Sequence, residues 1–245
     1  MNGPTDPGRR AFMSRGSALT AAVAVAPGVT LYDYARARPA GEAASSAVRW
    51  GMLIDTTRCS SGCDACVRAC NRENALGDGT QATDAQWMRK IDLEQEGTGR
   101  KLSLPMMCQH CAEPPCVDVC PTGASFKRAD GIVLVDKHRC IGCRYCMMAC
   151  PYKARSFVHE PVTDHSGQTP RGKGTVESCT LCVQRVDRGQ QPACVEACAQ
   201  EGKQAIVFGN LNDPNSTISQ RLREVTSVKL RADLGVDPGV AFVGL

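Results

Sequence analysis

The stretch "CIGCRYCMMACP", residues 140–151, decides the fold of this chain. It contains four cysteines in the spacing C-x2-C-x2-C-x3-C, and a proline follows the last of them. Three thiolates that are two residues apart can wrap one iron–sulfur cubane from a single loop, while the fourth reaches a neighbouring cluster. Proline suits the redirection of the chain at this point, because it fixes φ and donates no hydrogen bond. The spacing therefore predicts [4Fe–4S] binding.

Three further groups of four cysteines accompany this stretch, so the chain has sixteen cysteines and none is left over. The spacing is C-x3-C-x2-C-x3-C in the first group, C-x2-C-x4-C-x3-C in the second and C-x2-C-x11-C-x3-C in the fourth. In chain order, the members are Cys59, Cys63, Cys66 and Cys70 (group one), Cys108, Cys111, Cys116 and Cys120 (group two), Cys140, Cys143, Cys146 and Cys150 (group three), and Cys179, Cys182, Cys194 and Cys198 (group four).

Two other roles for the cysteines stay open, although iron–sulfur binding is favoured over both. An exported protein with an even cysteine count can be a disulfide framework, but such frameworks rarely repeat cysteines this closely. Zinc also binds four thiolates supplied by C-x2-C pairs, but it gives no reason for a third close cysteine or for the proline. Covalent haem is excluded, because no C-x-x-C is followed by histidine.

The composition agrees with a cofactor-organised interior. The 245 residues suffice for one or two domains, yet aromatic residues make up only 4% of the chain. The formal net charge of +4 is mild and does not indicate nucleic-acid binding. The sequence has no phosphate-binding glycine loop and no nucleophile elbow. Sixteen cysteines for four cubanes also leave no open coordination site, so we expect a protein without catalytic residues.

Residues 1–40 have the pattern of an export signal. An arginine pair, Arg9 and Arg10, precedes the weakly apolar run "SALTAAVAVAPGVTL" (17–31) and the small-residue stretch "ARA" (35–37). The twin arginine indicates the Tat route, which carries folded, cofactor-loaded proteins. The apolar run is too short and too broken to span a bilayer comfortably. We therefore predict a periplasmic protein that is peripheral to the membrane and associates with it through partners.

An internal repeat predicts the fold. "GMLIDTTRC" (51–59) aligns with "GIVLVDKHRC" (131–140), and each reads as a short strand that runs into a cluster loop. "GKQAIVFGN" (202–210) is a further candidate strand. We expect an α+β fold of tandem bacterial-ferredoxin-like units, that is, two pseudo-twofold dicluster units with loop-rich insertions at 71–101 and 159–174. The predicted domain spans 50–210, and 211–245 is predicted to be a polar tail.

The stretches "CQHCAEPPCVDVC" (108–120), "CIGCRYCMMACPYKARSF" (140–157) and "ESCTLCVQRVDRGQQPACVEAC" (177–198) resemble the four-cluster ferredoxin subunits of the dimethyl sulfoxide reductase family. The resemblance covers about residues 50–216. Within that family the chain looks most like the periplasmic subunits of the Dsr sulfur-metabolism membrane complexes.

The resemblance implies four [4Fe–4S] clusters with ligands crossed between groups. Groups two and three would form one unit, and groups one and four the other. The ligand sets would be Cys108, Cys111, Cys116 and Cys150 (set A), Cys140, Cys143, Cys146 and Cys120 (set B), Cys59, Cys63, Cys66 and Cys198 (set C), and Cys179, Cys182, Cys194 and Cys70 (set D).

The chain departs from the family pattern at two places. Ser60, Ser61 and Gly62 add one residue to the first C-x2-C, and we expect Gly62 to absorb it with a positive φ. Ala199 stands where a proline normally follows the last cysteine.

The resemblance also implies function. The chain would be an electron-transfer subunit that links an integral-membrane quinone-reactive subunit to a periplasmic multihaem cytochrome c in a sulfur-metabolism respiratory complex. The alternative partner is a molybdopterin subunit of a reductase for polysulfide, tetrathionate, nitrite or a similar substrate.

For other residues near the clusters we expect structural roles and not roles as ligands. His110 and His138 are expected to be polar loop residues, and Trp87 is expected to lie in a satellite core. Apolar gaps around the clusters are expected to be filled by Met106, Met107, Met147 and Met148.

Overall fold

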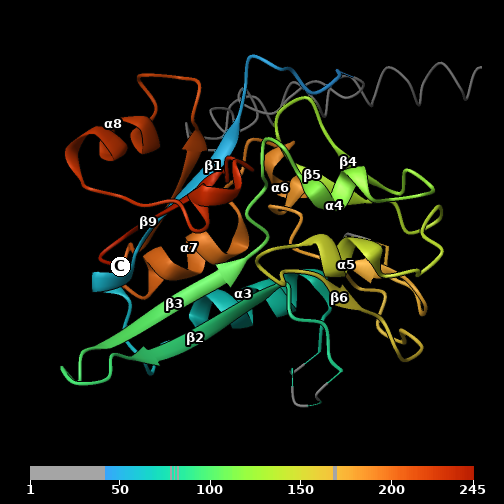
Figure 1. Cartoon of the computed structure of the whole chain (residues 1–245), viewed down its shortest axis with the longest axis horizontal. Coiled ribbons are helices and arrows are strands. Elements are labelled where there is room, and N and C mark those ends of the chain that lie inside the picture. The colour runs from blue at the N-terminus through green and yellow to red at the C-terminus, as the bar shows by residue number, and fades with distance from the viewer. Residues whose placement is uncertain (1–41, 78, 80, 82, 168–169) are drawn as a thin grey trace, which may run out of the picture.

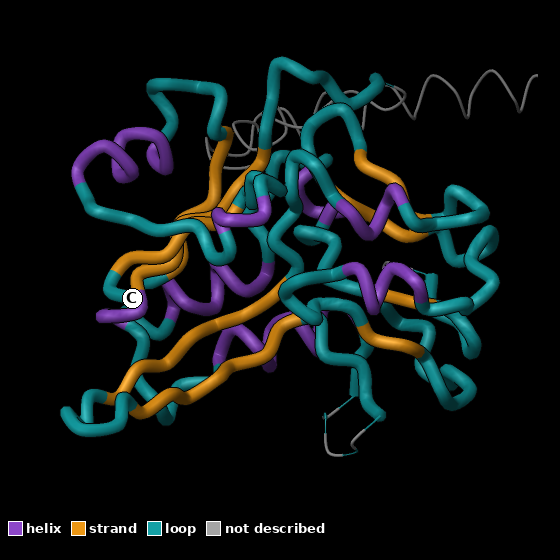
Figure 2. The backbone as a smooth tube through the Cα atoms, viewed as in Figure 1, coloured by secondary structure: helices purple, strands orange, loops and turns teal. Residues whose placement is uncertain are grey.

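The computed structural model describes residues 42–77, 79, 81, 83–167 and 170–245. Short helices and short strands are mixed along the chain, as expected for an α+β protein, and Figure 2 shows how much loop connects them. The strands are β1 (Trp50–Asp55), β2 (Met88–Glu94), β3 (Lys101–Met107), β4 (Ser125–Lys127), β5 (Val133–Val135), β6 (Ser156–Phe157), β7 (Val176–Glu177), β8 (Ile206–Asn210) and β9 (Val240–Val243). The helices are α3 (Ala65–Asn74), α4 (Pro115–Asp118), α5 (Tyr145–Ala149), α6 (Val183–Val186), α7 (Ala193–Gln200) and α8 (Thr217–Glu224), with 3-10 turns at Thr56–Arg58 and Ala232–Leu234.

A three-stranded sheet in the order β8-β1-β9 holds the first predicted strand at its centre. β1 pairs antiparallel with β8 and parallel with β9. Side chains alternate along β1, so Met52 and Ile54 join the main core, whereas Leu53 packs with Ile218 of α8 on the other face. Because both faces are covered, the strand reads as one continuous apolar run.

The segment 211–245, which was predicted to be a polar tail, belongs to this sheet. β9 supplies its edge strand, and Phe242 is fully buried. α8 begins at an N-cap where the Ser216 hydroxyl accepts a hydrogen bond from the Ser219 amide. The prediction missed these elements because α8 is mostly polar and β9 is only four residues long. The domain boundary at residue 210 was therefore wrong.

The cluster-bearing helices pack in two pairs. α3 packs against α7 beside the three-stranded sheet, and α4 packs against α5. In Figure 1 the first pair lies below and behind β1, while α4 and α5 lie together on the other side of the molecule with β4, β5 and β6. Groups one and four thus meet at one pair of helices, and groups two and three meet at the other.

The insertion between groups one and two contains a long hairpin. β2 and β3 pair antiparallel from Met88↔Met107 to Glu94↔Lys101, and the hairpin extends away from the body of the molecule (Figure 1). At its inner end, Trp87 and Met107 are almost completely buried in the main core. Trp87 therefore lies in the principal core, which corrects its assignment to a satellite core.

Candidate functional site: four sets of converging thiols

All sixteen cysteines lie in the described part of the chain, and none of them is disulfide-bonded. Eleven are buried, four are partly buried, and only Cys143 is exposed. Burying so many thiols without a covalent partner gives them the environment of cofactor ligands.

Two small cavities are each lined by four cysteines from two different groups. The first, between α5, the β4-β5 hairpin and β7, has an empty volume of about 300 Å³ and is lined by Cys120, Cys140, Cys143 and Cys146. The second, beside α3 and α7, has an empty volume of about 290 Å³ and is lined by Cys70, Cys179, Cys182 and Cys194. The structure thus brings together the four members of set B and the four members of set D.

The electrostatic neighbours of Cys66 and Cys111 place the members of the other two sets near one another. Burial first, and then the nearby thiols of Cys59, Cys198 and Cys63, raises the pKa of Cys66 to about 12. In set A, burial and then Cys116 and Cys150 raise the pKa of Cys111 to about 12. Each neighbourhood contains the crossed member from the other group. Cluster ligation by these sets remains a prediction, and the proximity is what crossed ligation requires.

Hydrogen-bond donors surround the thiols. The amide of Ala205 donates to Cys198 Sγ at 3.2 Å, and the amide of Ser125 donates to Cys120 Sγ at 3.3 Å. Trp87 Nε1 and Thr180 Oγ1 line the set D cavity and are buried without a partner among the described residues. Buried donors normally have acceptors, and the sulfurs of a cubane in this cavity would supply them. The donor set therefore fits a [4Fe–4S] cluster.

A single metal ion and a cubane require different spacings of their thiolate ligands. In the described part of the chain, no three His, Cys, Asp or Glu side chains stand close enough to share a single metal ion. The four ligands of a zinc ion all lie about 2.3 Å or less from it. A cubane is held by one thiolate on each of its irons, so its thiolates stand farther apart.

The loop of group three depends on a glycine. Gly142 has φ +71°, and a Cβ added there would collide with the carbonyl oxygen of Gly174. An L-residue would be strained at this φ and would displace the neighbouring loop. The glycine therefore allows the loop that contains Cys140 and Cys143 to pack closely against Gly174, in the segment that precedes β7.

The irregular first group is held by a lysine rather than by a special glycine. Gly62 is absent from the described residues that have positive φ, which corrects the expected conformation. Instead, Lys90 of β2 reaches across and donates to the carbonyl oxygens of Ser60, of Ser61 at 2.9 Å and of Cys63 at 2.6 Å. One ammonium thus fixes the loop that contains the extra residue, a contact that the sequence alone did not reveal.

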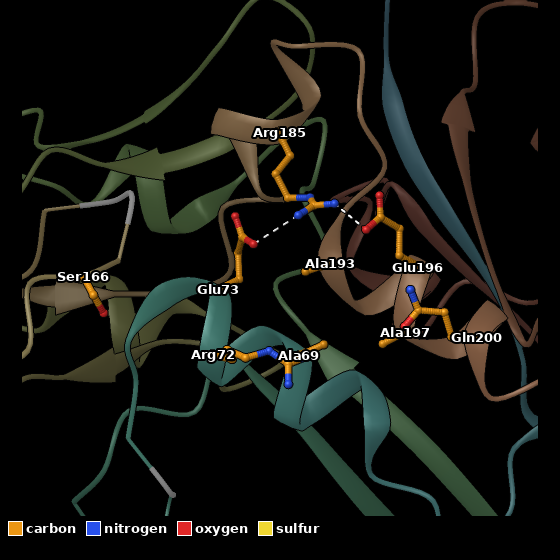
Figure 3. A pocket seen from close by; sticks show the side chains of 9 residues that line it. All are labelled: Ala69, Arg72, Glu73, Ser166, Arg185, Ala193, Glu196, Ala197 and Gln200. Carbon is orange, nitrogen blue, oxygen red and sulfur yellow. Dashed lines mark hydrogen bonds and ion pairs between the residues drawn. The ribbon is translucent and has the colours of Figure 1, made fainter. Parts of the chain in front are cut away.

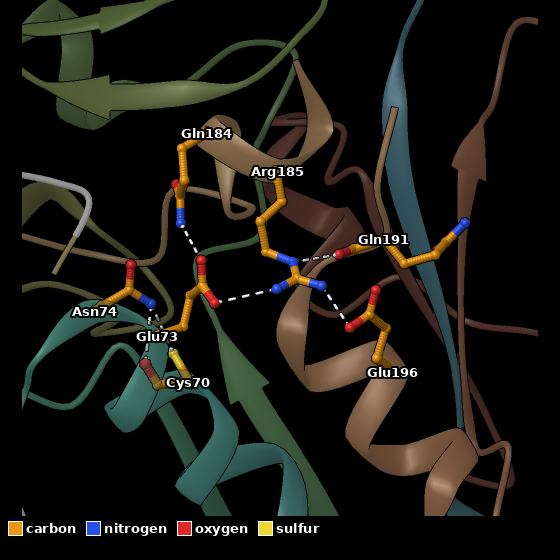
Figure 4. Close-up of polar contacts among 7 residues, drawn as sticks. All are labelled: Cys70, Glu73, Asn74, Gln184, Arg185, Gln191 and Glu196. Carbon is orange, nitrogen blue, oxygen red and sulfur yellow. Dashed lines mark hydrogen bonds and ion pairs between the residues drawn. The ribbon is translucent and has the colours of Figure 1, made fainter. Parts of the chain in front are cut away.

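A partly buried ion network ties α3 to α6 and α7 beside set D. Figure 4 shows Arg185 between Glu73, at 3.2 Å, and Glu196, while its Nε donates to the Gln191 carbonyl at 2.8 Å. Gln184 donates to Glu73 at 2.9 Å from the same short helix. These contacts clamp the helices that carry Cys70 and Cys194.

The same network borders a polar cleft with a floor of small side chains. Figure 3 shows Ala69, Ala193 and Ala197 between the charged groups of α3 and α7. Ala69 and Ala193 also pack against Cys182 in a small buried cluster. The alanines let the two helices approach closely, which brings their cysteines together.

Two residues near the thiols differ from their predicted roles, and a third was not predicted at all. His110 is buried, not a polar loop residue, and its Nδ1 accepts a hydrogen bond from the Val133 amide at 3.0 Å. Burial, followed by nearby Arg155, lowers the pKa of His110 to about 3, so the ring is neutral. Met148 is 66% exposed and fills no apolar gap, whereas Met106 and Met107 are buried as expected. Arg155 is buried among the cysteines and was not singled out from the sequence.

The predicted export signal, with Arg9 and Arg10, lies outside the described residues. Among the residues that are described, no helix combines the length and the apolar character needed to cross a bilayer.

Comparison with known proteins gives consistent matches. A protein-family profile described as "4Fe-4S dicluster domain" matches residues 100–209, which contain groups two, three and four. The Hdr-like menaquinol oxidoreductase iron-sulfur subunit 1 of Archaeoglobus fulgidus is 46% identical over 225 residues, which cover 80% of this chain and 84% of the relative. A tetrathionate reductase subunit of Salmonella typhimurium is 37% identical over 245 residues, which cover 98% of this chain and 89% of the relative.

A further relative extends the same pattern. The arsenate respiratory reductase iron-sulfur subunit ArrB of Shewanella sp. (strain ANA-3) is 34% identical over 235 residues, which cover 80% of this chain and 96% of the relative. Together with the sixteen cysteines, the matched domain supports [4Fe–4S] clusters as the cofactor.

Proposed function

The chain belongs to the family of iron–sulfur subunits that contain the 4Fe-4S dicluster ferredoxin domain, and from this premise we propose that it relays single electrons through four [4Fe–4S] clusters. The proposal rests on one observation: the sixteen thiols lie near one another as sets A to D, and each set contains one member from a different group. In this proposal the fold consists of two tandem dicluster units, with sets C and D in one and sets A and B in the other.

Electrostatic neighbours that belong to different sets support a linear order for the relay. Burial and then the neighbouring thiols raise the pKa of Cys194 in set D, and Cys66 of set C is among those neighbours. Burial also raises the pKa of Cys179 in set D, where Cys108 of set A contributes. Within the other unit, Cys116 and Cys146 are neighbours from sets A and B. The order C–D–A–B places each cluster beside the next, so electrons pass without a moving part.

The two ends of this order have different surfaces. At the set B end, the loop that contains the exposed Cys143 and the helix α5 that follows it carry exposed apolar side chains: Ile141 is 67%, Met148 is 66% and Tyr145 is 54% exposed. Exposed apolar side chains gathered in this way favour a protein partner that covers them. We assign this end to the integral-membrane quinone-reactive subunit, through which the chain would associate with the membrane.

The set C end has charged side chains around an open cleft, together with the exposed Leu93. Beside Cys59, a shallow cleft is lined by the β2-β3 hairpin, including Asp92, Glu94 and Lys101. A polar surface next to a partly buried cluster ligand suits a soluble redox partner. We assign this end to the periplasmic partner, which exchanges electrons with the cluster of set C.

Two identities for that partner follow from different observations. The tetrathionate reductase and arsenate respiratory reductase relatives favour a molybdopterin subunit of a reductase, which we place first. The menaquinol oxidoreductase relative favours the second identity, the DsrO subunit of a Dsr complex with a multihaem cytochrome c as partner. With either partner, we propose that the chain acts in the periplasm after Tat export, as a subunit without catalytic residues.

Purification of the intact complex from native membranes under anaerobic conditions tests the proposal. We expect reducible [4Fe–4S] signals in electron paramagnetic resonance (EPR), and a copurifying membrane subunit. Molybdenum in the preparation supports the reductase partner, whereas covalent haem without molybdenum overturns it in favour of the cytochrome. A preparation with no reducible cluster signal would contradict the relay itself.

A further inference from the structure

Arg155 is a buried cation that contacts the cluster thiols directly. It follows group three, one residue before β6, and is only 6% exposed. Its Nη2 donates to Cys116 Sγ at 3.0 Å and to Ser125 Oγ at 2.8 Å. Charged side chains are rarely buried unless a partner compensates them.

No carboxylate compensates this charge among the described residues. The ion pairs of that part of the chain include Arg128, Arg171 and Arg185, but not Arg155. Two further nitrogens of its guanidinium, Nε and Nη1, are buried without a hydrogen-bond partner there. Since arginine stays protonated in proteins, the charge has to be balanced by something else at this position.

The surrounding thiols belong to two different ligand sets. Arg155 interacts electrostatically with Cys116 and Cys108 of set A and with Cys146 of set B. Ser125, which accepts from Arg155, also donates its amide hydrogen to Cys120 of set B at 3.3 Å. The guanidinium thus stands between the two predicted clusters of one unit.

We propose that Arg155 is a positioning and electrostatic residue that raises the reduction potentials of the clusters of sets A and B together. The proposal rests on the proposed function and deepens it. A cubane held by four thiolates is an anion, and it gains one negative charge when it takes up one electron. No proton or further reactant is needed. A fixed cation in a site of low dielectric stabilises the reduced state more than the oxidised state, so the potential rises.

An EPR-monitored redox titration of the anaerobically purified, cluster-loaded full chain tests this. Arg155→Gln removes the charge but keeps hydrogen-bond donors, and we expect lower potentials for the clusters of sets A and B. The clusters of sets C and D should keep their potentials. Arg155→Lys retains the charge, and we expect it to preserve most of the wild-type potentials. The signals are assigned beforehand with Cys111→Ser and Cys143→Ser.

Arg139→Gln is the matched control, because Arg139 precedes group three but is exposed, so that solvent screens its charge. Equal shifts in Arg139→Gln and Arg155→Gln would overturn the proposal, as would unchanged potentials or a shift of only one cluster.

If Arg155→Gln loads too little iron for the redox titration, wild-type protein labelled with [15N]arginine is measured instead. Pulsed EPR should then detect a nitrogen coupled to a reduced cluster, and Arg155→Lys should lose that coupling. Absence of the coupling in the wild type would contradict the proposal. A chain with four reducible clusters but unshifted potentials overturns only this inference, whereas a chain without reducible clusters overturns the relay.

Discussion

Cys66 of α3 and Cys198 of α7 are electrostatic neighbours, although group one and group four lie at opposite ends of the cysteine-containing sequence. Burial, then Cys59, then Cys198 raise the pKa of the Cys66 thiol to about 12. α3 and α7 also contact each other along their lengths. A cluster held by these thiols would join two helices that the chain connects only through all the intervening elements.

We expect the cluster-free protein not to hold its native fold. Metal-ligand free energy becomes folding free energy when the ligands are disordered without the metal. Here many core residues are cysteines, and only 4% of the chain is aromatic. Circular dichroism melting of protein stripped of iron should show no cooperative transition. A cooperative transition near the melting temperature of the loaded protein would refute this.

Lys90 should be required for the cluster of set C. Replacing it with Met removes the ammonium that donates hydrogen bonds to the carbonyls of Ser61 and Cys63. The loop with the extra residue then loses the contacts that hold it in place. Iron analysis of the anaerobic wild type should give about sixteen irons per chain, four for each cubane, and Lys90→Met should give about twelve. Lys101→Met is the control, because the Lys101 ammonium forms an exposed ion pair with Glu94 at 3.8 Å and does not hold the loop of group one. Full iron content in Lys90→Met would show that these contacts are dispensable.

The two glycines of the cluster loops should respond differently to alanine. Gly142→Ala places a Cβ at positive φ and against the Gly174 carbonyl, so we expect about 1–3 kcal/mol of strain and loss of iron from set B. A Cβ at Gly62 meets no atom within 4 Å, and Gly62→Ala should stay within about 0.5 kcal/mol of the wild type. Denaturant unfolding of the loaded proteins measures both. Equal stability of the two variants would contradict the role given to Gly142.

Much of the fold was predictable, because ligand spacing is a strong local constraint. The strands before Cys59 and Cys140 were recognised as apolar runs leading into cluster loops, and β1 and β5 lie there. The Lys90 contacts and the buried Arg155 were not predictable, since each depends on where a distant loop lies in space. β9 was missed for the same reason: four residues carry little pattern, and their burial follows from pairing with β1.

Arg9 and Arg10 should be needed for export. Replacing both with Lys keeps the charge but removes the twin arginine that the Tat pathway recognises. We expect the variant to accumulate in the cytoplasm with its clusters loaded, as shown by fractionation and iron analysis. Arg15→Lys, which lies outside the arginine pair, is the control and should be exported normally. Normal periplasmic delivery of the double variant would show that the protein uses another route.

Crossed ligation is the central claim, and Cys150→Ser tests it most directly. Cys150 is an electrostatic neighbour of Cys111 and Cys116 of set A, and it is not among the cysteines that line the set B cavity. With the signals of sets A and B assigned from Cys111→Ser and Cys143→Ser, Mössbauer and EPR spectra of Cys150→Ser should show a perturbed set A cluster and an intact set B cluster. If Cys150→Ser instead alters the same signal as Cys143→Ser, each group ligates its own cluster, and the two-unit architecture is contradicted.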